Sequence, residues 1–542
     1  MSRSREHLTL RLLASLVGLA AALPFGYLVW RTNEYGWSGA LDVAVSARSL
    51  RLLTSTIGLA VAVTASAVAI SLPVAWLTVR TDLPARRFWT VVTALPLAVP
   101  TYVGAWTVIG ALGPRGMLAE ILGVGSIPSL YGFWGAWAVL TLFSYPYVLL
   151  TVRAAWSRLD PALEEASRVL GRSGTETFIR VVLPQLRPAL TGGSLLVALY
   201  TLSDFGAVTM LRYDTFTRAI YVQYRGALDR GAAAVLGLIL VILTIVVLSG
   251  EQRFRRSEVV HRLHGGGARS APLVRLGAWR ATATVGLSAL VTLSLVVPVT
   301  VIAYWLIRGI RADEPVLPGV NLIVNSLGVS LLAAVATTIA AVPVVLFVRR
   351  SPGRLANIVE RLSWSGYALP GVVVALALVF FGASVLPVAY QTIGMLVFAY
   401  AVLFLPQAIG AVRASLAQVT PSIEEASLLL GVPRRETFRR VLLPLLRPGL
   451  GAGAGLVFLT AMKELPATLL LAPTGFSTLA TRVWNATNEG FLGRAAGPAL
   501  ALVALSSVPM AVFLARSELR AEQTAQTVNA GAAEPSESTV TV

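Results

Sequence analysis

The chain has 542 residues, of which 56% are hydrophobic and 13% charged, and its mean hydropathy is +0.74. These values exclude a soluble globular protein and indicate a membrane protein. The net charge is +18, and the absence of cysteine excludes disulfides, thiolate metal sites and cysteine nucleophiles.

Apolar segments long enough to cross a bilayer recur along the whole chain. A spanning helix needs about 20 residues, and the segments are too long and too uniformly apolar for the alternating strands of a barrel. The sequence therefore predicts an all-α polytopic membrane protein. The twelve predicted spans are 8–30, 53–79, 88–112, 130–152, 189–211, 231–250, 280–306, 322–348, 363–385, 390–412, 449–471 and 495–515.

The arginines gather in alternate loops between the predicted spans. Arg80, Arg86 and Arg87 follow the second span, and the segments 153–187 and 413–447 carry many more. By the positive-inside rule these loops, and both termini, face the cytoplasm. Because the basic charge is accounted for in this way, the bilayer is the expected partner and nucleic acid is not.

The hydropathy pattern and the sequence itself repeat once. At an offset of 260, Pro161–Ser167 matches Pro421–Ser427, and the match continues through Gly171 and Gly431 to Arg187 and Arg447. Such duplication predicts two parallel six-helix halves. We expect a first half at 1–250, a cytoplasmic linker at 251–279, a second half at 280–516, and a disordered cytoplasmic tail at 517–542.

The repeated segment lies between the fourth and fifth spans of each half and reads as two short helices joined by a turn. In the first copy, Asp160 is a natural N-cap and Gly171 suits a left-handed C-terminal residue. Ser173 with Glu176 offers a capping box for the second helix, and Leu183-Pro184 is expected to end it. Surface amphipathic helices are the alternative interpretation, which the duplication disfavours.

The motif within these segments resembles the EAA loop of ABC importer permeases. Glu165-Ala166-Ser167, three residues, Gly171, nine residues, Val181, one residue and Leu183-Pro184 follow its spacing, and the second copy repeats it from Glu425. The chain departs from the family pattern in two places: serine stands in place of the second alanine, and valine stands in place of isoleucine. The resemblance implies the type I importer permease fold, with a first EAA loop at 154–188 and a second EAA loop at 414–448.

The resemblance also implies partners. Each loop would carry a coupling helix docked into one ATP-binding subunit, so two copies of that subunit are expected, together with an extracytoplasmic substrate-binding protein. The inner (cytoplasmic) membrane is the implied location. The implied ATPase-coupling residues are Glu164, Glu165, Ala166, Gly171, Glu424, Glu425, Ala426 and Gly431.

The chain lacks an ATPase site of its own. A Walker A motif needs a lysine to hold the phosphates, and the single lysine, Lys463, lies in Ala461-Met462-Lys463-Glu464. We therefore expect a transport subunit with no catalytic residue, no cofactor and no metal site, whose partner binds ATP and magnesium.

Ionisable residues inside predicted spans are candidates for the translocation pathway. Asp204 in the fifth span and Lys463 with Glu464 in the eleventh qualify, and Asp204 and Glu464 are 260 residues apart. About 16 residues of helix put them roughly 24 Å from the cytoplasmic end. A structural ion pair or snorkelling at the interface is the alternative.

The sequence segments around these residues resemble those of the fused ferric-iron permeases. They are Leu202–Gly206, Thr215–Thr217, Lys463–Thr468, Pro473–Phe476 and Leu479–Thr481. Fused thiamine permeases share the architecture, and a proton- or sodium-coupled carrier of two six-helix halves is a further alternative. A hard cation favours oxygen ligands, for which Tyr213, Asp214, Tyr221, Tyr224 and Asp229 are candidates, although tyrosines also form interface belts.

Overall fold

The structure is a computed structural model, and it describes residues 2–114, 116–127, 130–226, 230–257 and 273–533. Within these ranges the side chains of 2–6, 251–257, 421, 424, 425, 428, 434, 435 and 513–533 lie outside the description. The described elements are helices, apart from one isolated bridge between Thr81 and Val274.

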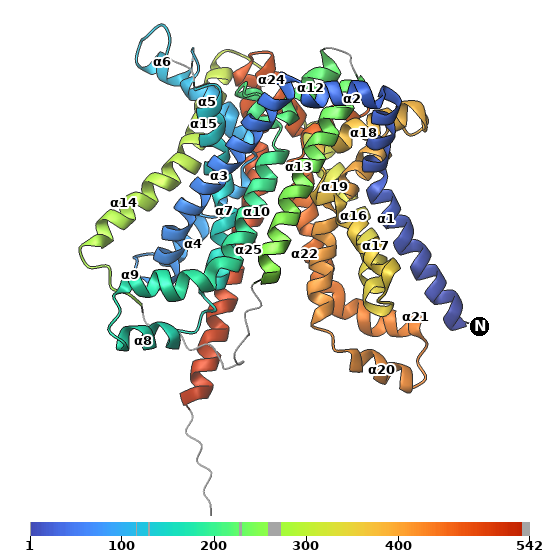
Figure 1. Cartoon of the computed structure of the whole chain (residues 1–542). Helices are drawn as coiled ribbons and strands as arrows, with labels where there is room; N and C mark the ends of the chain where they lie inside the picture. Colours follow the sequence, from blue (N-terminus) through green and yellow to red (C-terminus); the bar gives the residue numbers. More distant parts are fainter. Residues whose placement is uncertain (1, 115, 128–129, 227–229, 258–272, 534–542) are drawn as a thin grey trace, which may run out of the picture. The chain divides into compact units, whose positions relative to one another are not determined.

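The helices of the first sequence half are drawn in Figure 1 from blue to green. They are α1 (Ser2–Tyr35), α2 (Trp37–Val45), α3 (Ala47–Arg80), α4 (Arg86–Val92), η1 (Leu95–Ala98), α5 (Thr101–Leu112), α6 (Met117–Ile121), α7 (Phe133–Trp156), α8 (Ala162–Val169), α9 (Gly174–Thr177), the π-turn η2 (Phe178–Val182), α10 (Leu183–Ser203), α11 (Gly206–Met210), α12 (Phe216–Arg225) and α13 (Arg230–Ser257).

The helices of the second sequence half follow the same order. They are α14 (Trp279–Val291), the π-turn η3 (Thr292–Val296), α15 (Val297–Arg311), α16 (Val320–Arg350), α17 (Arg354–Ser363), η4 (Ser365–Tyr367), α18 (Gly371–Ser384), α19 (Ile393–Ala417), α20 (Pro421–Leu429), α21 (Arg434–Thr437), the π-turn η5 (Phe438–Leu442), α22 (Leu443–Met462), α23 (Pro466–Leu471), α24 (Leu479–Asn488) and α25 (Leu492–Ala533).

Among the described residues, ten helical segments are long and apolar enough to cross a membrane, and two further bent pairs bring the number to twelve. The two predicted spans 88–112 and 363–385 correspond to these bent pairs. They turn by 91° and 108° just before Pro100 and Pro370. Proline disfavours helical backbone in the residue before it, and Val99 is indeed extended, with φ −79° and ψ 123°.

The residues divide into two compact units. Unit 1 comprises Met1–Gly58, Leu202–Val246 and Ala303–Leu502, and unit 2 comprises Leu59–Thr201, Val247–Ile302 and Val503–Val542. The units do not coincide with the sequence halves. The predicted boundaries 1–250 and 280–516 therefore describe the duplication rather than the compact units.

Helix α1 explains part of this difference, because it packs within unit 1 against helices of the second sequence half. The Tyr27 and Ser384 hydroxyls are 2.7 Å apart, and the Ser365 hydroxyl donates to the carbonyl of Ala21 over 3.2 Å. The α1 backbone at Gly18 approaches that of Val359. The first helix of each half is thus exchanged, since α14 belongs to unit 2.

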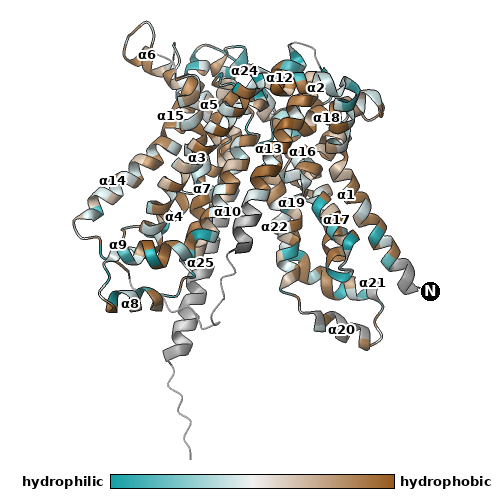
Figure 2. Cartoon of the chain, viewed as in Figure 1, coloured by the Kyte–Doolittle hydropathy of each residue, from teal (hydrophilic) through white to brown (hydrophobic). Residues whose placement is uncertain are grey.

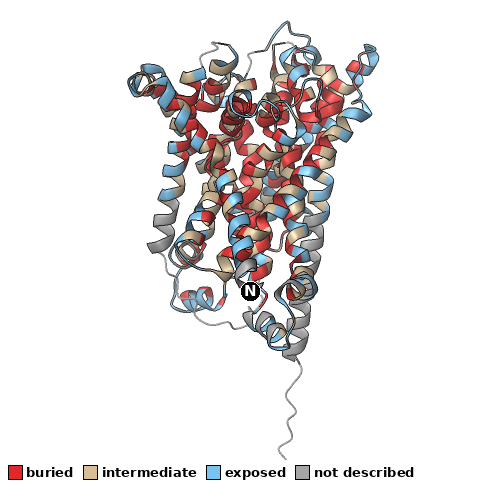
Figure 3. Cartoon of the chain, turned by 90° about the vertical axis from the view of Figure 1, so that its right-hand side faces the viewer, coloured by how far each residue is buried: buried red, intermediate tan, exposed pale blue. Residues whose placement is uncertain are grey.

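The apolar surfaces of the spans form the cores. In unit 1, α18 is apolar all round and ten of its fourteen residues are buried. Figure 2 shows α18 mainly in hydrophobic colours and α17 with more hydrophilic ones. Figure 3 shows buried positions concentrated along the long helices. A helix that is hydrophobic on every face can lie in a protein core or in lipid, and the burial of α18 shows that it lies in the core.

The C-terminal segment differs from the predicted disordered tail. Helix α25 continues to Ala533, and residues 534–542 lie outside the described part of the chain. The segment from 518 to 533 is rich in alanine and also contains glutamate and glutamine, which are strong helix formers. It therefore extends the last span without needing an apolar face.

Candidate functional site

The first EAA loop folds as a helix, a turn and a second short helix, as predicted. The Asp160 carboxylate accepts a hydrogen bond of 2.9 Å from the backbone N–H of Ala162, at the start of α8. Gly171 ends the helix with φ +80°, a conformation that favours glycine. The Ser173 hydroxyl then accepts from the N–H of Glu176 over 3.2 Å and caps α9.

A pair of hydroxyls closes the turn in both loops. The Ser167 and Thr177 hydroxyls are 3.0 Å apart, and so are those of Ser427 and Thr437, which are their equivalents at the offset of 260. Gly431 has φ +79°, matching Gly171. The two EAA loops therefore share the same turn geometry and the same hydrogen bond between hydroxyls.

The structure separates the two glutamates of the first loop. Glu164 is buried, and its carboxylate forms an ion pair with the guanidinium of Arg80 at the end of α3. Glu165 and Ala166 are exposed. In the second loop Ala426 is exposed, while the side chains of Glu424 and Glu425 lie outside the described residues. Of the two glutamates, Glu164 anchors the helix and Glu165 is available to a partner.

Each loop also presents an apolar tip, which we define as Val169 with Leu170 and Leu429 with Leu430. These side chains are 78–88% exposed. They belong to polar segments outside the long apolar spans, so lipid does not account for their exposure. Sequence inspection overlooked them, although two adjacent aliphatic residues before the turn glycine were a readable signal. Exposed apolar patches of this kind mark interaction sites.

Leu183-Pro184 does not end the second helix of the loop, so that prediction is wrong. Helices α9, η2 and α10 run without a break from Gly174 to Ser203, and the second copy repeats the arrangement through η5. A π-turn precedes the proline in each copy. The wider turn accommodates the missing N–H and the ring, which would clash in a regular α-helix.

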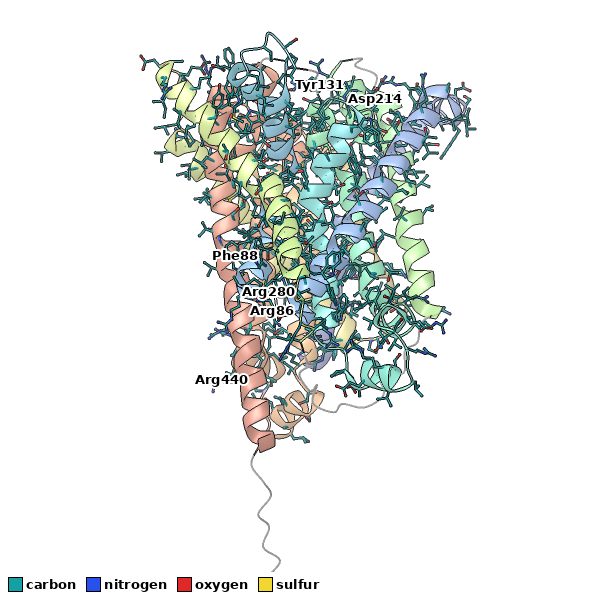
Figure 4. The ribbon with its side chains drawn as sticks, turned by 90° about the vertical axis from the view of Figure 1, so that its left-hand side faces the viewer. Arg86, Phe88, Tyr131, Asp214, Arg280 and Arg440 are labelled. Carbon is teal, nitrogen blue, oxygen red and sulfur yellow. The ribbon has the colours of Figure 1, made fainter. Side chains whose placement is uncertain are left out.

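The linker contacts the same region of unit 2. The N–H of Val274 donates to the carbonyl of Arg80 over 2.8 Å, and the N–H of Leu276 donates to the Asp82 carboxylate over 2.8 Å. Arg280, labelled in Figure 4, donates to that carboxylate over 2.8 Å. The Leu276 N–H and the Arg280 charge hold the pKa of Asp82 below its ordinary value. Linker and first EAA loop thus share Arg80.

The pathway candidates Asp204 and Glu464 occupy equivalent structural positions in unit 1. The Asp204 carboxylate accepts from the N–H groups of Ala207 and Val208 over 3.0 and 3.2 Å, which caps α11. Glu464 accepts from the N–H groups of Ala467 and Thr468 over 3.0 and 3.1 Å, which caps α23. Each carboxylate starts a short helix where a span breaks.

This geometry supports the structural interpretation of the two carboxylates, while a direct contact with cargo stays a prediction. Lys463 is the C-cap of α22 and is partly exposed.

Two of the candidate oxygen ligands have other partners in the described part of the chain. The Tyr213 hydroxyl donates to the carbonyl of Ser55 over 3.3 Å, and Asp214, labelled in Figure 4, pairs with Arg218. Burial raises the pKa of Tyr224, which opposes a phenolate. Asp229 lies outside the described residues. No group of three or more acidic or histidine side chains that could hold a metal ion occurs among the described residues.

Comparison with known proteins identifies relatives of the whole chain. It is 35% identical over 508 residues to the Fe(3+)-transport system permease protein FbpB 2 of Haemophilus influenzae, covering 93% of this chain and 97% of that protein. It is 25% identical to the ferric transport system permease protein FbpB of Actinobacillus pleuropneumoniae, covering 78% of this chain and 63% of that one.

Shorter relatives match part of the chain. The sulfate transport system permease protein CysT of Salmonella typhimurium is 28% identical over 255 residues, which are 45% of this chain and 92% of that protein. Residues 72–257 and 333–516 each match the family described as binding-protein-dependent transport system inner membrane component. Each match contains one EAA loop. The chain therefore belongs to this family of multi-pass inner membrane permeases, with the family's domain present twice.

Proposed function

We propose that the chain is the two-half permease of an ABC importer for ferric iron, driven by two copies of an ATP-binding subunit that dock at the two EAA loops. A substrate-binding protein delivers the cargo from outside the cytoplasm. ATP and magnesium bind the partner subunits. The EAA loops and both termini face the cytoplasm, in accordance with the distribution of arginine.

The equal geometry of the two EAA loops carries the proposal. Each has a glycine in the left-handed region, a hydroxyl pair 3.0 Å apart and an exposed apolar tip. Two equivalent docking surfaces suit a partner that acts as a dimer. In the first loop, the buried Glu164–Arg80 pair fixes the helix to α3. A push on the tip is therefore transmitted to a spanning helix rather than absorbed by a free loop.

The assignment of iron rests on the relatives that match both halves. The protein from Haemophilus influenzae, named for Fe(3+) transport, is covered almost end to end. The sulfate permeases match only about half of the chain. Proton or sodium coupling in a secondary transporter would require several ionisable residues within spans, and the described carboxylates Asp204 and Glu464 are engaged as helix caps.

The docking step is tested with the chain reconstituted in nanodiscs with a candidate ATP-binding subunit. We expect Leu170→Ser with Leu430→Ser to weaken binding of the subunit and to abolish the stimulation of ATP hydrolysis, while membrane insertion stays normal. Leu317→Ser is the matched control, because Leu317 is 76% exposed in a loop outside the EAA segments. Glu165→Gln should weaken coupling as well. Normal binding by the tip variant contradicts the docking assignment.

The cargo is tested separately in proteoliposomes that contain the complete importer. We expect the iron-loaded binding protein to stimulate both ATP hydrolysis and Fe³⁺ uptake, whereas proteins loaded with sulfate or thiamine do neither. Stimulation by thiamine or sulfate alone would overturn the choice of iron and leave the importer assignment intact. Uptake that collapses with the proton gradient while ATP persists would overturn the importer assignment itself.

A further inference from the structure

Two hydroxyl groups fix the starts of α12 and α24 in the same way. The Thr56 hydroxyl on α3 accepts a hydrogen bond of 3.2 Å from the N–H of Phe216, the first residue of α12. The Ser326 hydroxyl on α16 accepts one of 2.8 Å from the N–H of Leu479, the first residue of α24. Thr56 and Ser326 are 270 residues apart, the offset that also relates Pro100 to Pro370. The two helices are therefore structural equivalents.

This equivalence matches two aromatic residues that the sequence analysis did not pair. Tyr221 and Trp484 each lie five residues after the first residue of their helix. Their rings meet edge to face, with centroids 6.2 Å apart. Phe205 packs against both, at 4.8 Å from Tyr221 and 5.0 Å from Trp484. Figure 1 shows α12 and α24 side by side at the top of the view.

Contact between equivalent residues locates the pseudo-twofold axis of the duplication. In a two-fold arrangement, a position meets its own equivalent only at the axis. Translocation paths in proteins built from repeats run along the interface between the repeats. The ring cluster formed by Phe205, Tyr221 and Trp484 therefore lies where a path between equivalent elements has to pass.

The cluster is closed to water in this conformation. Phe205 and Trp484 are 2% and 3% exposed. Tyr221 is half-buried, and its hydroxyl accepts a hydrogen bond of 3.1 Å from the exposed Arg225. The apolar bodies of the rings thus seal the axis, and the polar edge of the cluster faces solvent. Edge-to-face packing also favours a defined arrangement over a loose apolar contact.

Asp204 holds the central ring in place. Its carboxylate caps α11, and its backbone carbonyl accepts a hydrogen bond of 2.6 Å from the Thr217 hydroxyl of α12. Phe205 is the next residue, so its backbone is fixed from both sides. Leu465 follows Glu464 in the equivalent place and is also buried. Asp204 is on this evidence a positioning residue for Phe205.

We propose that Phe205, Tyr221 and Trp484 form an aromatic lid that closes the translocation path on its outer side. The assignment to the outer side rests on the proposed function and its orientation. Because the lid spans elements from both sequence halves, separating the halves at this level separates α12 from α24 and opens the path. Cargo released by the binding protein would enter only after the rings part.

Single cysteines test the lid, since the chain has none of its own. Thr460→Cys places a partly exposed reporter on α22, five residues before Leu465 and so on the inner side of the lid. Thr474→Cys places an exposed control in the loop before α24. A membrane-impermeant maleimide is added to right-side-out vesicles, and the labelling rate of each cysteine is measured. The same measurement in inside-out vesicles reports the orientation independently.

We expect Thr474→Cys to react from outside in every background and Thr460→Cys to be protected in the parent. Trp484→Ala should accelerate labelling of Thr460→Cys at least tenfold, Phe205→Leu should do so less, and Tyr221→Phe, which keeps the ring, should leave it unchanged. Rapid outside labelling of Thr460→Cys in the parent overturns the lid. So does an unchanged rate in both Trp484→Ala and Phe205→Leu. The assay uses neither iron nor an ATPase, so it remains decisive if those assignments fail.

Discussion

The buried ion pair between Arg80 and Glu164 predicts how firmly the first coupling helix is held. The two side chains are 9% and 10% exposed. Removing one partner of such a pair leaves a buried charge and costs about 3–5 kcal/mol. At about 1.4 kcal/mol per tenfold change, Arg80→Met should raise the opening equilibrium of α8 about 140- to 4,000-fold. Glu164→Gln should act in the same direction and more weakly, because its amide still accepts a hydrogen bond.

Hydrogen exchange of the α8 amides in nanodiscs measures this equilibrium directly. Glu165→Gln is the matched control, because it makes the same change on the same helix at an exposed position and should alter exchange by about twofold at most. Arg80→Met with Glu164→Leu removes both charges and should exchange more slowly than Arg80→Met alone. Equal exchange in Glu164→Gln and Glu165→Gln, or exchange in the double variant as fast as in Arg80→Met alone, would refute the reasoning.

Three further predictions follow from local geometry. Gly171→Ala and Gly431→Ala should each destabilise their EAA loop by about 1–2 kcal/mol in exchange measurements, because both φ angles are near +80°, whereas Gly174→Ala should be near neutral. Asp82→Ala should release the linker. In the parent the same release should occur as the pH falls below about 4, because the folded protein lowers the pKa of Asp82 and protonation of this carboxylate removes its interactions with Leu276 and Arg280. The variant should lose that pH dependence. Glu464→Ala should lower the free energy of unfolding by about 0.5–2 kcal/mol, measured by thermal unfolding in detergent, because the cap of α23 is lost. Glu464→Gln should keep most of that free energy.

The duplicated loop was predictable because its signals are local. Asp160 as a cap, Gly171 as a left-handed residue and Ser173 before Glu176 all depend on backbone geometry within a few residues. The same kind of reasoning failed at Pro184. Whether a proline ends a helix or sits after a π-turn depends on the packing that the continuing helix gains.

Other features depended on partners distant in sequence. Which glutamate of the pair turns inward is decided by Arg80, 84 residues before Glu164. The pairing of Tyr221 with Trp484 was hidden because the offset drifts from 260 to 263 between Asp204 and α12. The bends before Pro100 and Pro370 were hidden by uniformly apolar composition, which predicts burial in lipid but says nothing about direction.

The exchanged first helix has a consequence for biosynthesis. During translation α1 is made before any of its partners in unit 1, such as α16 and α18, which follow it by roughly 300 residues. Its Ser384 and Val359 neighbours emerge only after the linker has been synthesised. The first half therefore waits in the membrane with part of the surface of α1 uncovered, until the ribosome has completed most of the second. A single continuous chain keeps that helix beside its eventual partners, whereas two separate chains would have to find each other by diffusion.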